Sequence, residues 1–404
     1  MGSLVAPAPL VRSAQRPLDR LRSLAAPTLA WPSAASLLAD RAHQPGWSVT
    51  ANCSAGGSCR LLATDDAWLA VNMPRATDWE LANAWLETDR SPNWDWTALG
   101  GALAGRRSLA LLERARLLGL AVAPAAGLNA DEHTPPHCEK QQLGPTSPPR
   151  PGARPLVVDL SALWAGPLCS HLLWLCGARV IKVESPTRPD GARDGNPEFY
   201  ELLNQGKSCL SLDLPAGREA LARLLAQADI VIEGSRPRAL QQLGIDATSL
   251  LRANPGLTWV SITGYGRRAP FAEWIAFGDD AAAAGGLCAL MHKAVGTYQF
   301  VGDALADPLT GIHAALAAWN AWQAGGGQLI DASLVGAARA TREAASTREG
   351  PAALLAACQH WWRQAVADRS FAVRTTVNPR TPQAPARGLG ADSVELIREF
   401  RLEC

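Results

Sequence analysis

The sequence carries almost no excess of either charge. Its 38 Lys and Arg residues stand against 37 Asp and Glu, for a formal net charge of +1 over 404 residues. The whole chain therefore generates no field that would attract a nucleic acid or an anionic membrane. Apolar runs of 18 or more residues are also absent, and the densest run, Leu168 to Cys176, is too short to cross a bilayer. We expect no nucleic-acid or membrane partner, and local groups must hold any anionic ligand.

The glycine patterns that bind nucleotides are missing too. No Gly-x-x-x-x-Gly-Lys-Ser/Thr segment occurs, which excludes a P-loop. The turn after the apolar run Leu156 to Leu160 contains a single glycine, Gly166, and the next residue, Pro167, lacks an N–H donor. A dinucleotide needs closer backbone approach than this turn offers. No Gly-x-Ser-x-Gly elbow marks a serine nucleophile.

The nine cysteines form no pattern of disulfides or metal ligands. Their number is odd, and no secretory apolar segment precedes them, so we expect reduced thiols in a cytoplasmic protein. An organelle transit peptide in the Arg-, Ala- and Ser-rich first 25 residues is the less favoured alternative. Cys53 and Cys59 are separated by five residues, which matches no common zinc pattern, so we expect no metal site.

The periodicity of apolar residues divides the chain into parts. Residues 1–130 combine short apolar runs with Trp- and Leu-rich helical patterns, typical of a small α+β domain. Residues 131–154 are rich in proline, have no apolar period and are predicted to be a linker. From 155 to 345, strand and helix signals alternate, which predicts an α/β domain with a doubly wound, mostly parallel, Rossmann-like sheet.

Ligands of such sheets bind at the carboxyl ends of the strands. We therefore expect a site among the loops that follow Leu160, Glu184, Glu233 and Thr263. The predicted strands are 156–160, 179–184, 210–214, 230–233 and 259–263.

One acidic residue at a predicted helix start has two interpretations. Asp307 followed by Pro308 is typical of a carboxylate that caps its own helix, and the residues alone favour this interpretation. The alternative is a nucleophile. Next to helix N–H groups and the small Gly311, the carboxylate would attack an acyl thioester to give a mixed anhydride and then an enzyme-bound thioester.

Residues from about 155 to 340 resemble the large domain of the class III (CaiB/BaiF) CoA-transferases, a family that includes alpha-methylacyl-CoA racemases. The segments that carry the resemblance follow the family's order. They are Asp159-Leu-x4-Ala165-Gly-Pro, Gly177-Ala-Arg-Val-Ile-Lys-Val-Glu184, Asn204-Gln-Gly-Lys207, Leu210-Ser-Leu-Asp-Leu, Ala228-Asp-Ile-Val-Ile-Glu233, Arg236-Pro, Leu243-Gly, Asn254-Pro, Ser261-Ile-Thr-Gly-Tyr-Gly266 and Asp307-x2-Thr-Gly311.

By this resemblance Asp307 matches the catalytic aspartate, which favours the nucleophile over the cap. Ala165 matches a position that lines CoA, with Trp164 in place of a polar residue of some transferases. Gly264 and Tyr265 match the family's Gly-Tyr-Gly turn, where a small residue admits the thioester arm and a ring packs on it.

Three cations lie near positions where the family binds the phosphates of CoA. They are Arg188, Lys207 and Arg236, although Ser208 and Gln242 replace arginines of many relatives. Guanidinium and ammonium groups suit the concentrated negative charge of CoA. The resemblance implies acyl-CoA as a substrate and no permanently bound cofactor.

Two departures from the family bear on function. Asp279 stands where racemases place a basic histidine, and without that imidazole proton exchange lacks one partner, so a transferase is favoured over a racemase. The family's small domain normally follows the catalytic aspartate. Here residues 1–130 resemble it and come first, while 346–404 are expected to form a helical segment and a tail that returns to the large domain.

We therefore expect an acyl-CoA:carboxylate CoA-transferase that acts on an acyl-CoA and a carboxylic acid. The resemblance implies a homodimer, interlocked unless the altered order of domains changes how the chains thread. Two alternatives stay open. One is an acyl-CoA racemase or isomerase in which Asp307 and Asp279 handle protons, and the other is an acyl-CoA-binding relative without turnover.

Overall fold

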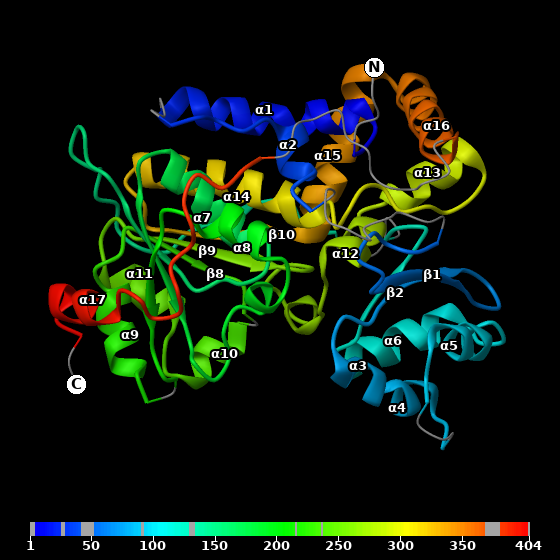
Figure 1. The fold of residues 1–404 in the computed structure, drawn as a ribbon, viewed down its shortest axis with the longest axis horizontal. Helices are drawn as coiled ribbons and strands as arrows, with labels where there is room; N and C mark the ends of the chain where they lie inside the picture. The colour runs from blue at the N-terminus through cyan, green and yellow to red at the C-terminus, as the bar shows by residue number, and fades with distance from the viewer. Residues whose placement is uncertain are drawn as a thin grey trace.

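The large domain is built on a seven-stranded sheet in the order β4-β10-β9-β8-β5-β6-β7 (Figure 1). The computed structural model describes residues 5–25, 29–41, 52–89, 93–128, 134–214, 216–235, 237–367 and 380–402. The first strand of the sheet, β4, pairs antiparallel with β10, and the other strands run parallel. The strands are β4 (Glu139–Gln142), β5 (Leu156–Asp159), β6 (Arg179–Glu184), β7 (Ser208–Ser211), β8 (Ile230–Glu233), β9 (Thr258–Thr263) and β10 (Gln328–Ser333).

Helices cover both faces of this sheet because its strands are apolar on both sides. In β8, Ile230 and Ile232 face one core while Val231 faces the other. The first core contains α1 (Ala8–Ala25), α2 (Ala34–Leu38), α7 (Ala165–Leu175), α14 (Ala306–Gln323) and α15 (Leu334–Glu349). The second contains α9 (Arg218–Leu225), α11 (Ala247–Ala253) and α17 (Ser393–Phe400). The predicted doubly wound α/β fold is confirmed.

The strand order places the topological switch of the sheet between β5 and β8. From β5 the chain proceeds outward through β6 and β7, and then through β8, β9 and β10 on the other side. At such a switch the loops after two neighbouring strands diverge and leave a crevice. The loops after β5 and β8 do lie together, because a Cβ on Gly234 would be 3.7 Å from the Cβ of Ser161.

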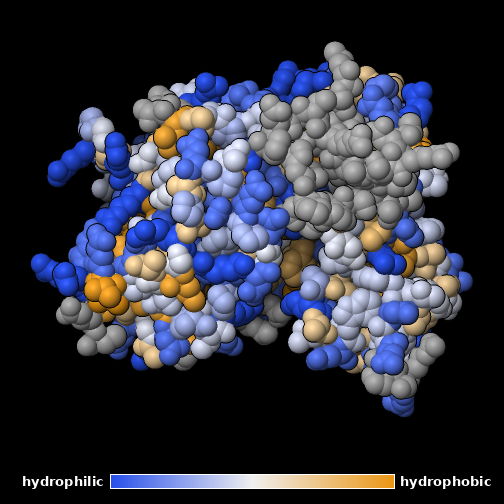
Figure 2. Space-filling model, viewed as in Figure 1, coloured by the Kyte–Doolittle hydropathy of each residue, from blue (hydrophilic) through white to orange (hydrophobic). Residues whose placement is uncertain are grey.

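The small unit is a three-stranded antiparallel sheet with helices on one face. It comprises β1 (Cys59–Ala63), β2 (Trp68–Asn72), β3 (Ala121–Pro124), α3 (Ala76–Glu80), α4 (Ala82–Leu86), α5 (Trp96–Leu103) and α6 (Ser108–Leu118). The buried Trp85 donates its indole N–H to the carbonyl of Leu111 at 2.9 Å. Strands β2 and β3 pack on α12 (Gly278–Ala284) of the large domain. A recess separates the two parts in the view of Figure 2.

The predicted N-terminal domain, residues 1–130, consists of two parts in the structure. Helices α1 and α2 pack on α14 and α15 of the large domain, far from β1–β3 (Figure 1). Of the described residues before β4, 52–89 and 93–128 contain the elements of the small unit. The predicted linker also does more than connect, because its residues 139–142 form β4. The limits of the small unit in the structure therefore differ from those predicted from the periodicity of apolar residues.

The last described residues of the chain contact the edge strand β7 of the large sheet. Residues 380–392 run across the molecule from the region of α2 to α17 (Figure 1). Asp392 accepts a hydrogen bond from the backbone N–H of Cys209 at 2.8 Å, and Ser393 accepts one from that of Ser211 at 3.0 Å. The remaining helices are α8 (Pro197–Asn204), α10 (Pro237–Gln242), α13 (Leu287–Val295), α16 (Pro351–Ala367) and the short 3-10 turns Gly191–Asp194 and Phe271–Glu273. Among the helices that the structure describes, none is both long and apolar enough to traverse a bilayer.

Candidate active site

The loop after β5 is held by a buried ion pair. Asp159, the last residue of the strand, has no exposed surface and accepts a hydrogen bond from the backbone N–H of Ser161 at 3.0 Å. The ammonium of Lys207 lies 3.1 Å from Asp159 and that of Lys182 donates to the carbonyl of Ser161 at 3.0 Å. Although burial opposes ionisation, Lys207 and Lys182 lower the pKa of Asp159 to about 2.

This geometry gives Lys207 a structural position. Its Nζ also donates to the carbonyl of Pro167 and to Asn204 Oδ1, each at 3.0 Å, and its side chain is 1% exposed. Burial lowers the pKa of Lys207 to about 8, so the ion pair with Asp159 is charged at neutral pH. The phosphate contact implied for Lys207 by the resemblance has no support in this geometry.

The turn that leads from the loop into α7 is strained, and it exposes Leu163 but buries Trp164. Leu163 has a left-handed backbone, with φ of +70°, and its N–H donates to Asp190 at 2.9 Å. The next side chain, Trp164, is buried edge-on against Phe199, with ring centroids 5.1 Å apart. Ala165 is the first helical residue and is buried, and its contact with CoA stays a prediction.

The other predicted CoA-binding residues follow three further strands in the sequence, β6, β8 and β9. Arg188 is exposed after β6, and the described residues hold no salt bridge to it. Arg236 lies outside the described residues. Gly264 and Tyr265 follow β9; a Cβ on Gly264 would lie 2.9 Å from that of Ala276, and the buried Tyr265 packs edge-on against Trp274. The small residue therefore accommodates the protein's own loop, and contact with a thioester arm stays a prediction.

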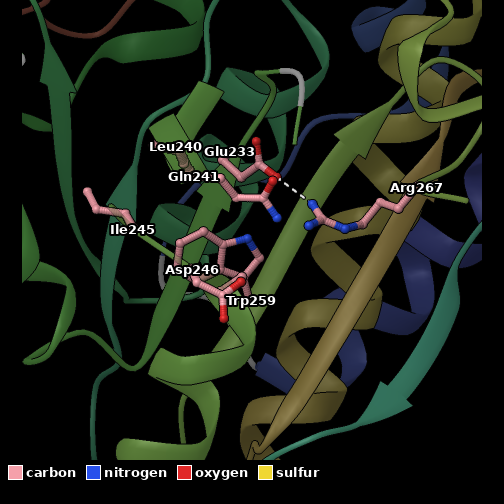
Figure 3. Close-up of a pocket in the computed structure, with 8 residues that line it drawn as sticks. Glu233, Leu240, Gln241, Ile245, Asp246, Trp259 and Arg267 are labelled. Atoms are coloured by element: carbon pink, nitrogen blue, oxygen red, sulfur yellow. Dashed lines mark hydrogen bonds and ion pairs between the residues drawn. The ribbon is translucent and has the colours of Figure 1, made fainter. Parts of the chain in front are cut away.

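A small polar pocket opens at the carboxyl ends of β8 and β9 (Figure 3). Glu233 points into it from the end of β8 and pairs with Arg267 at 2.9 Å and with the hydroxyl of Ser261 at 2.6 Å. Burial raises the pKa of Glu233. The pocket lies at the predicted edge of the sheet, next to the loop of Arg236, yet Glu233 is the only strand-end residue named in the sequence analysis that lines it.

Asp307 lies in the first turn of α14 and does not cap it. The N-cap position is Leu305, no side chain caps the helix, and the N–H of Asp307 donates to the carbonyl of Ala304 at 2.9 Å. The interpretation of Asp307 as an N-cap is therefore wrong, because the helix begins two residues earlier than the Asp-Pro pair indicates. Its partly buried carboxylate faces α12 instead: a Cβ on Gly278 would lie 2.4 Å from Asp307 Oδ2.

Three further carboxylates surround Asp307, and we call the four the aspartate cluster: Asp279, Asp280, Asp303 and Asp307. The first three are buried. Asp279 accepts from the N–H of Ala304 at 2.9 Å, which the left-handed backbone of Ala304 directs toward α12. Asp280 accepts from the side chain of Asn72 in β2 at 2.8 Å, so the small unit contributes to the cluster.

The cluster shifts the ionisation of its members toward neutral pH. Burial raises the pKa of Asp307 to about 7; Asp279, Asp280 and Asp303 act in the same direction, while Arg41 opposes them. Burial likewise raises the pKa of Asp279 and of Asp280 to about 7. A carboxylate with such a pKa is present in both protonation states at neutral pH and is suited to attack, to leave or to exchange protons.

Sequence reasoning identified Asp307 and Asp279 but missed the residues that complete their surroundings. Asp303 precedes Asp307 by four residues, so the sequence alone indicates that the two carboxylates lie close together. Arg41 and Asn72 gave no such signal, since Arg41 pairs with Asp303 across 262 positions of the chain. Through the described ranges, no three His, Cys, Asp or Glu side chains are grouped to hold a metal ion.

Comparison with known sequences bears on the half of the chain that holds Asp307. The profile of CoA-transferase family III matches residues 155–356. Succinyl-CoA–D-citramalate CoA-transferase of Chloroflexus aurantiacus is 33% identical over 197 residues, 46% of this chain and 49% of the relative. Succinate–glutarate CoA-transferase of Agrobacterium fabrum is 33% identical over 207 residues, 46% of this chain and 51% of the relative. The chain spans about half the length of these curated relatives.

Solved structures include more distant matches. A CaiB/BaiF family protein from Brucella suis has 20% identity and a TM-score of 0.46, covering 61% of this chain and 98% of that one. A hypothetical protein from Mycobacterium tuberculosis has 27% identity and a TM-score of 0.44, covering 50% and 57%.

Proposed function

The chain belongs to CoA-transferase family III, and from this premise we propose that it is an acyl-CoA:carboxylate CoA-transferase with Asp307 as its nucleophile. The observation that carries the proposal is the position of the Asp307 carboxylate. It lies partly buried in the first turn of α14, not used as a cap, at a pKa of about 7. A group that must attack and later leave works best with a pKa near the operating pH.

The reaction begins when a carboxylate oxygen of Asp307 attacks the carbonyl carbon of an acyl-CoA. The C–S bond breaks, CoA leaves as a thiolate, and a mixed anhydride forms. The thiolate then attacks the aspartyl carbonyl, which releases the donor acid and leaves an aspartyl-CoA thioester. An acceptor carboxylate attacks this thioester, the C–S bond breaks, and CoA leaves as a thiolate from a second anhydride. The thiolate then attacks the acceptor half of that anhydride, which gives the new acyl-CoA and regenerates the carboxylate of Asp307. Bonds exchange in pairs, with no net uptake of water or protons.

We assign CoA to the carboxyl ends of the strands around the switch of the sheet. The backbone at Ala165 would border the pantetheine, and the turn of Gly264 and Tyr265 the thioester arm. Arg188 and Arg236 would bind phosphates, and the exposure of Arg188 suits that role. Lys207 is left out of this assignment, because its three partners within the protein occupy its ammonium.

The substrates are proposed from chemistry and from the names of the relatives. Those names contain succinate or succinyl-CoA, with citramalate or glutarate as the second acid. Short dicarboxylic acids and their CoA monothioesters are therefore the first donors and acceptors to test. We also propose a homodimer, for which light scattering should give twice the mass of the chain; the mass of one chain would contradict it.

Mass spectrometry of the intact protein tests the covalent route. After incubation with a panel of acyl-CoAs, the wild type should gain a CoA-sized adduct, and hydroxylamine should convert it to a hydroxamate. Asp307→Ala should form neither. Asp95→Ala is the matched control, since Asp95 also stands at a helix start, exposed and accepting from the N–H of Ala98 at 2.7 Å. Its adduct should equal that of the wild type.

The other outcomes identify the alternatives. An adduct that persists in Asp307→Ala would place the nucleophile elsewhere. Binding of acyl-CoA without an adduct, but with exchange of the alpha proton in heavy water, would show a racemase or isomerase, with Asp279 as the second proton carrier. Binding with neither adduct nor exchange would show a protein that only binds acyl-CoA.

A further inference from the structure

Arg41 reaches the aspartate cluster from outside the part of the chain that matches the family. It follows α2, and its guanidinium binds Asp303 through two parallel hydrogen bonds, Nε to Oδ2 at 2.9 Å and Nη2 to Oδ1 at 2.7 Å. The carboxylate of Asp303 has no exposed surface, whereas the side chain of Arg41 is 24% exposed. Paired hydrogen bonds of this kind fix the orientation of a guanidinium as well as its distance.

The opposite side of the same guanidinium lies on aromatic rings. The Cζ of Arg41 is 4.6 Å from the ring centroid of Trp164 and 5.6 Å from that of Phe199. Trp164 immediately precedes Ala165, in the turn proposed to border CoA. Arg41 therefore connects the turn at the start of α7 with the segment that leads into α14 and Asp307.

The backbone next to Arg41 is anchored by the C-terminal part of the chain. Asp40 is buried and accepts from Arg380 Nε at 2.8 Å and from Nη2 at 2.5 Å. Nη1 of Arg380 lies 3.2 Å from Nε2 of the buried His171 on α7. Asp303 thus holds the guanidinium of Arg41, and Arg380 holds the side chain of Asp40, the preceding residue.

Charged and titratable groups approach Asp307 from several elements. Asp279 and Asp280 come from α12, Asp303 from the segment before α14, and Arg41 from the segment after α2. Behind them, the buried thiols of Cys59 in β1 and Cys288 in α13 interact with Asp279. Of these groups, Arg41 carries the positive charge.

We propose that Arg41 is a positioning residue for Asp307: clamped on Asp303 and stacked on Trp164, it fixes a positive charge beside the carboxylate and keeps that carboxylate ionised for attack. This inference rests on the proposed function of Asp307. The direction in which each substitution shifts the pKa of Asp307 follows from the charges around it. Burial and the three other carboxylates raise the pKa of Asp307 to about 7, so loss of Arg41 raises it further, while loss of the Asp303 charge lowers it.

Three substitutions separate charge from packing. In Arg41→Met, the acidic limb of the pH profile of kcat/KM should move to higher pH by about one unit or more. In Asp303→Asn it should move to lower pH. Arg41→Lys keeps the charge but not the paired hydrogen bonds, so its limb should stay near that of the wild type while kcat falls. Arg12→Met is the control, since it removes an arginine from an exposed pair with Glu349.

If Arg41 served packing alone, the acidic limb of the pH profile would lie at the same pH in every folded variant as in the wild type. That result would overturn the proposal. Carbon-13 NMR of protein labelled at the aspartate side-chain carboxyls gives the same test without turnover. The Asp307 signal, assigned by its absence in Asp307→Asn, should titrate at higher pH in Arg41→Met and at lower pH in Asp303→Asn. If the wild type transfers no CoA, the proposed function fails, and the NMR titrations still decide on Arg41. If Arg41→Met does not fold, Arg41→Gln, which also removes the charge, is titrated in its place.

Discussion

A single missing side chain allows the Asp307 carboxylate to lie where it does. Gly278 opens α12, and a Cβ there would lie 2.4 Å from both Asp307 Oδ2 and the carbonyl oxygen of Ala304. Both distances are shorter than any real contact of a Cβ, so a larger residue must displace either the carboxylate or the turn before α14. The position of the proposed nucleophile is thus set partly from another helix.

Gly278→Ala should lower kcat at least tenfold and destabilise the fold by about 1–3 kcal/mol, because the methyl group overpacks the site. Steady-state kinetics and urea unfolding measure the two effects. Gly101→Ala in α5 is the control, since a Cβ there meets no atom within 4 Å. Wild-type kinetics in Gly278→Ala would show that the carboxylate tolerates displacement.

The elements around β5 depend on buried charge as much as on apolar packing. Lys207 ties Asp159 at the end of β5 to the carbonyl of Pro167 in α7 and to Asn204 at the end of α8. The end of β5, the first turn of α7 and the end of α8 therefore all bind the same ammonium group, next to the turn proposed to bind CoA. Removing one partner of a buried ion pair leaves the other uncompensated, which costs far more than the pair itself contributes.

Lys207→Met should destabilise the protein by about 3–5 kcal/mol at pH 7. The pKa of Asp159 is lowered to about 2, so the stability that its ionisation supplies is complete above the ordinary aspartate pKa and is lost as the pH falls toward 2. The difference between variant and wild type should therefore narrow below about pH 4. Urea unfolding at several pH values tests this, with the exposed Lys293→Met as control. A difference independent of pH would contradict the assignment.

Elements with a clear apolar period were predictable, and the others were not. The strands 179–184 and 230–233 match β6 and β8, since each contains buried, β-branched apolar residues that mark a strand. Strand β4 was missed because its sequence, Glu-Lys-Gln-Gln, is almost entirely exposed and shows no alternation. The strand expected at 210–214 starts at Ser208 in the structure. Lys207 was expected at a phosphate because a sequence does not distinguish a buried, paired lysine from an exposed one.

On the scale of the whole molecule, segments from both sides of the family-matching region meet at Asp40, the residue next to Arg41. The segment of Asp40 and Arg41 precedes this region, and that of Arg380 follows it. No local pattern in the sequence predicts this contact, because Asp40 and Arg380 are 340 positions apart in the chain. This is why Asp307 could be proposed as the nucleophile from its own segment, whereas the residues around it could not be identified.

Arg380→Ala should destabilise the fold by about 3–5 kcal/mol, because it removes the paired hydrogen bonds that Arg380 donates to the buried carboxylate of Asp40. Arg179→Ala removes an arginine from a pair with Glu399 in which both side chains are well exposed, and should cost less than about 1 kcal/mol. Urea unfolding of the two variants measures the contrast. Equal losses would show that the Arg380 contact does not anchor the N-terminal segment.

The two margins of the large sheet have a consequence for association. On one side the sheet finishes in β4, four residues long and polar, and on the other the N–H groups of Cys209 and Ser211 in β7 are occupied by Asp392 and Ser393. Short, polar or covered edge strands resist the addition of a further strand. Neither margin of the large sheet therefore offers a template for sheet extension between copies, and the proposed homodimer must use other surfaces of the molecule.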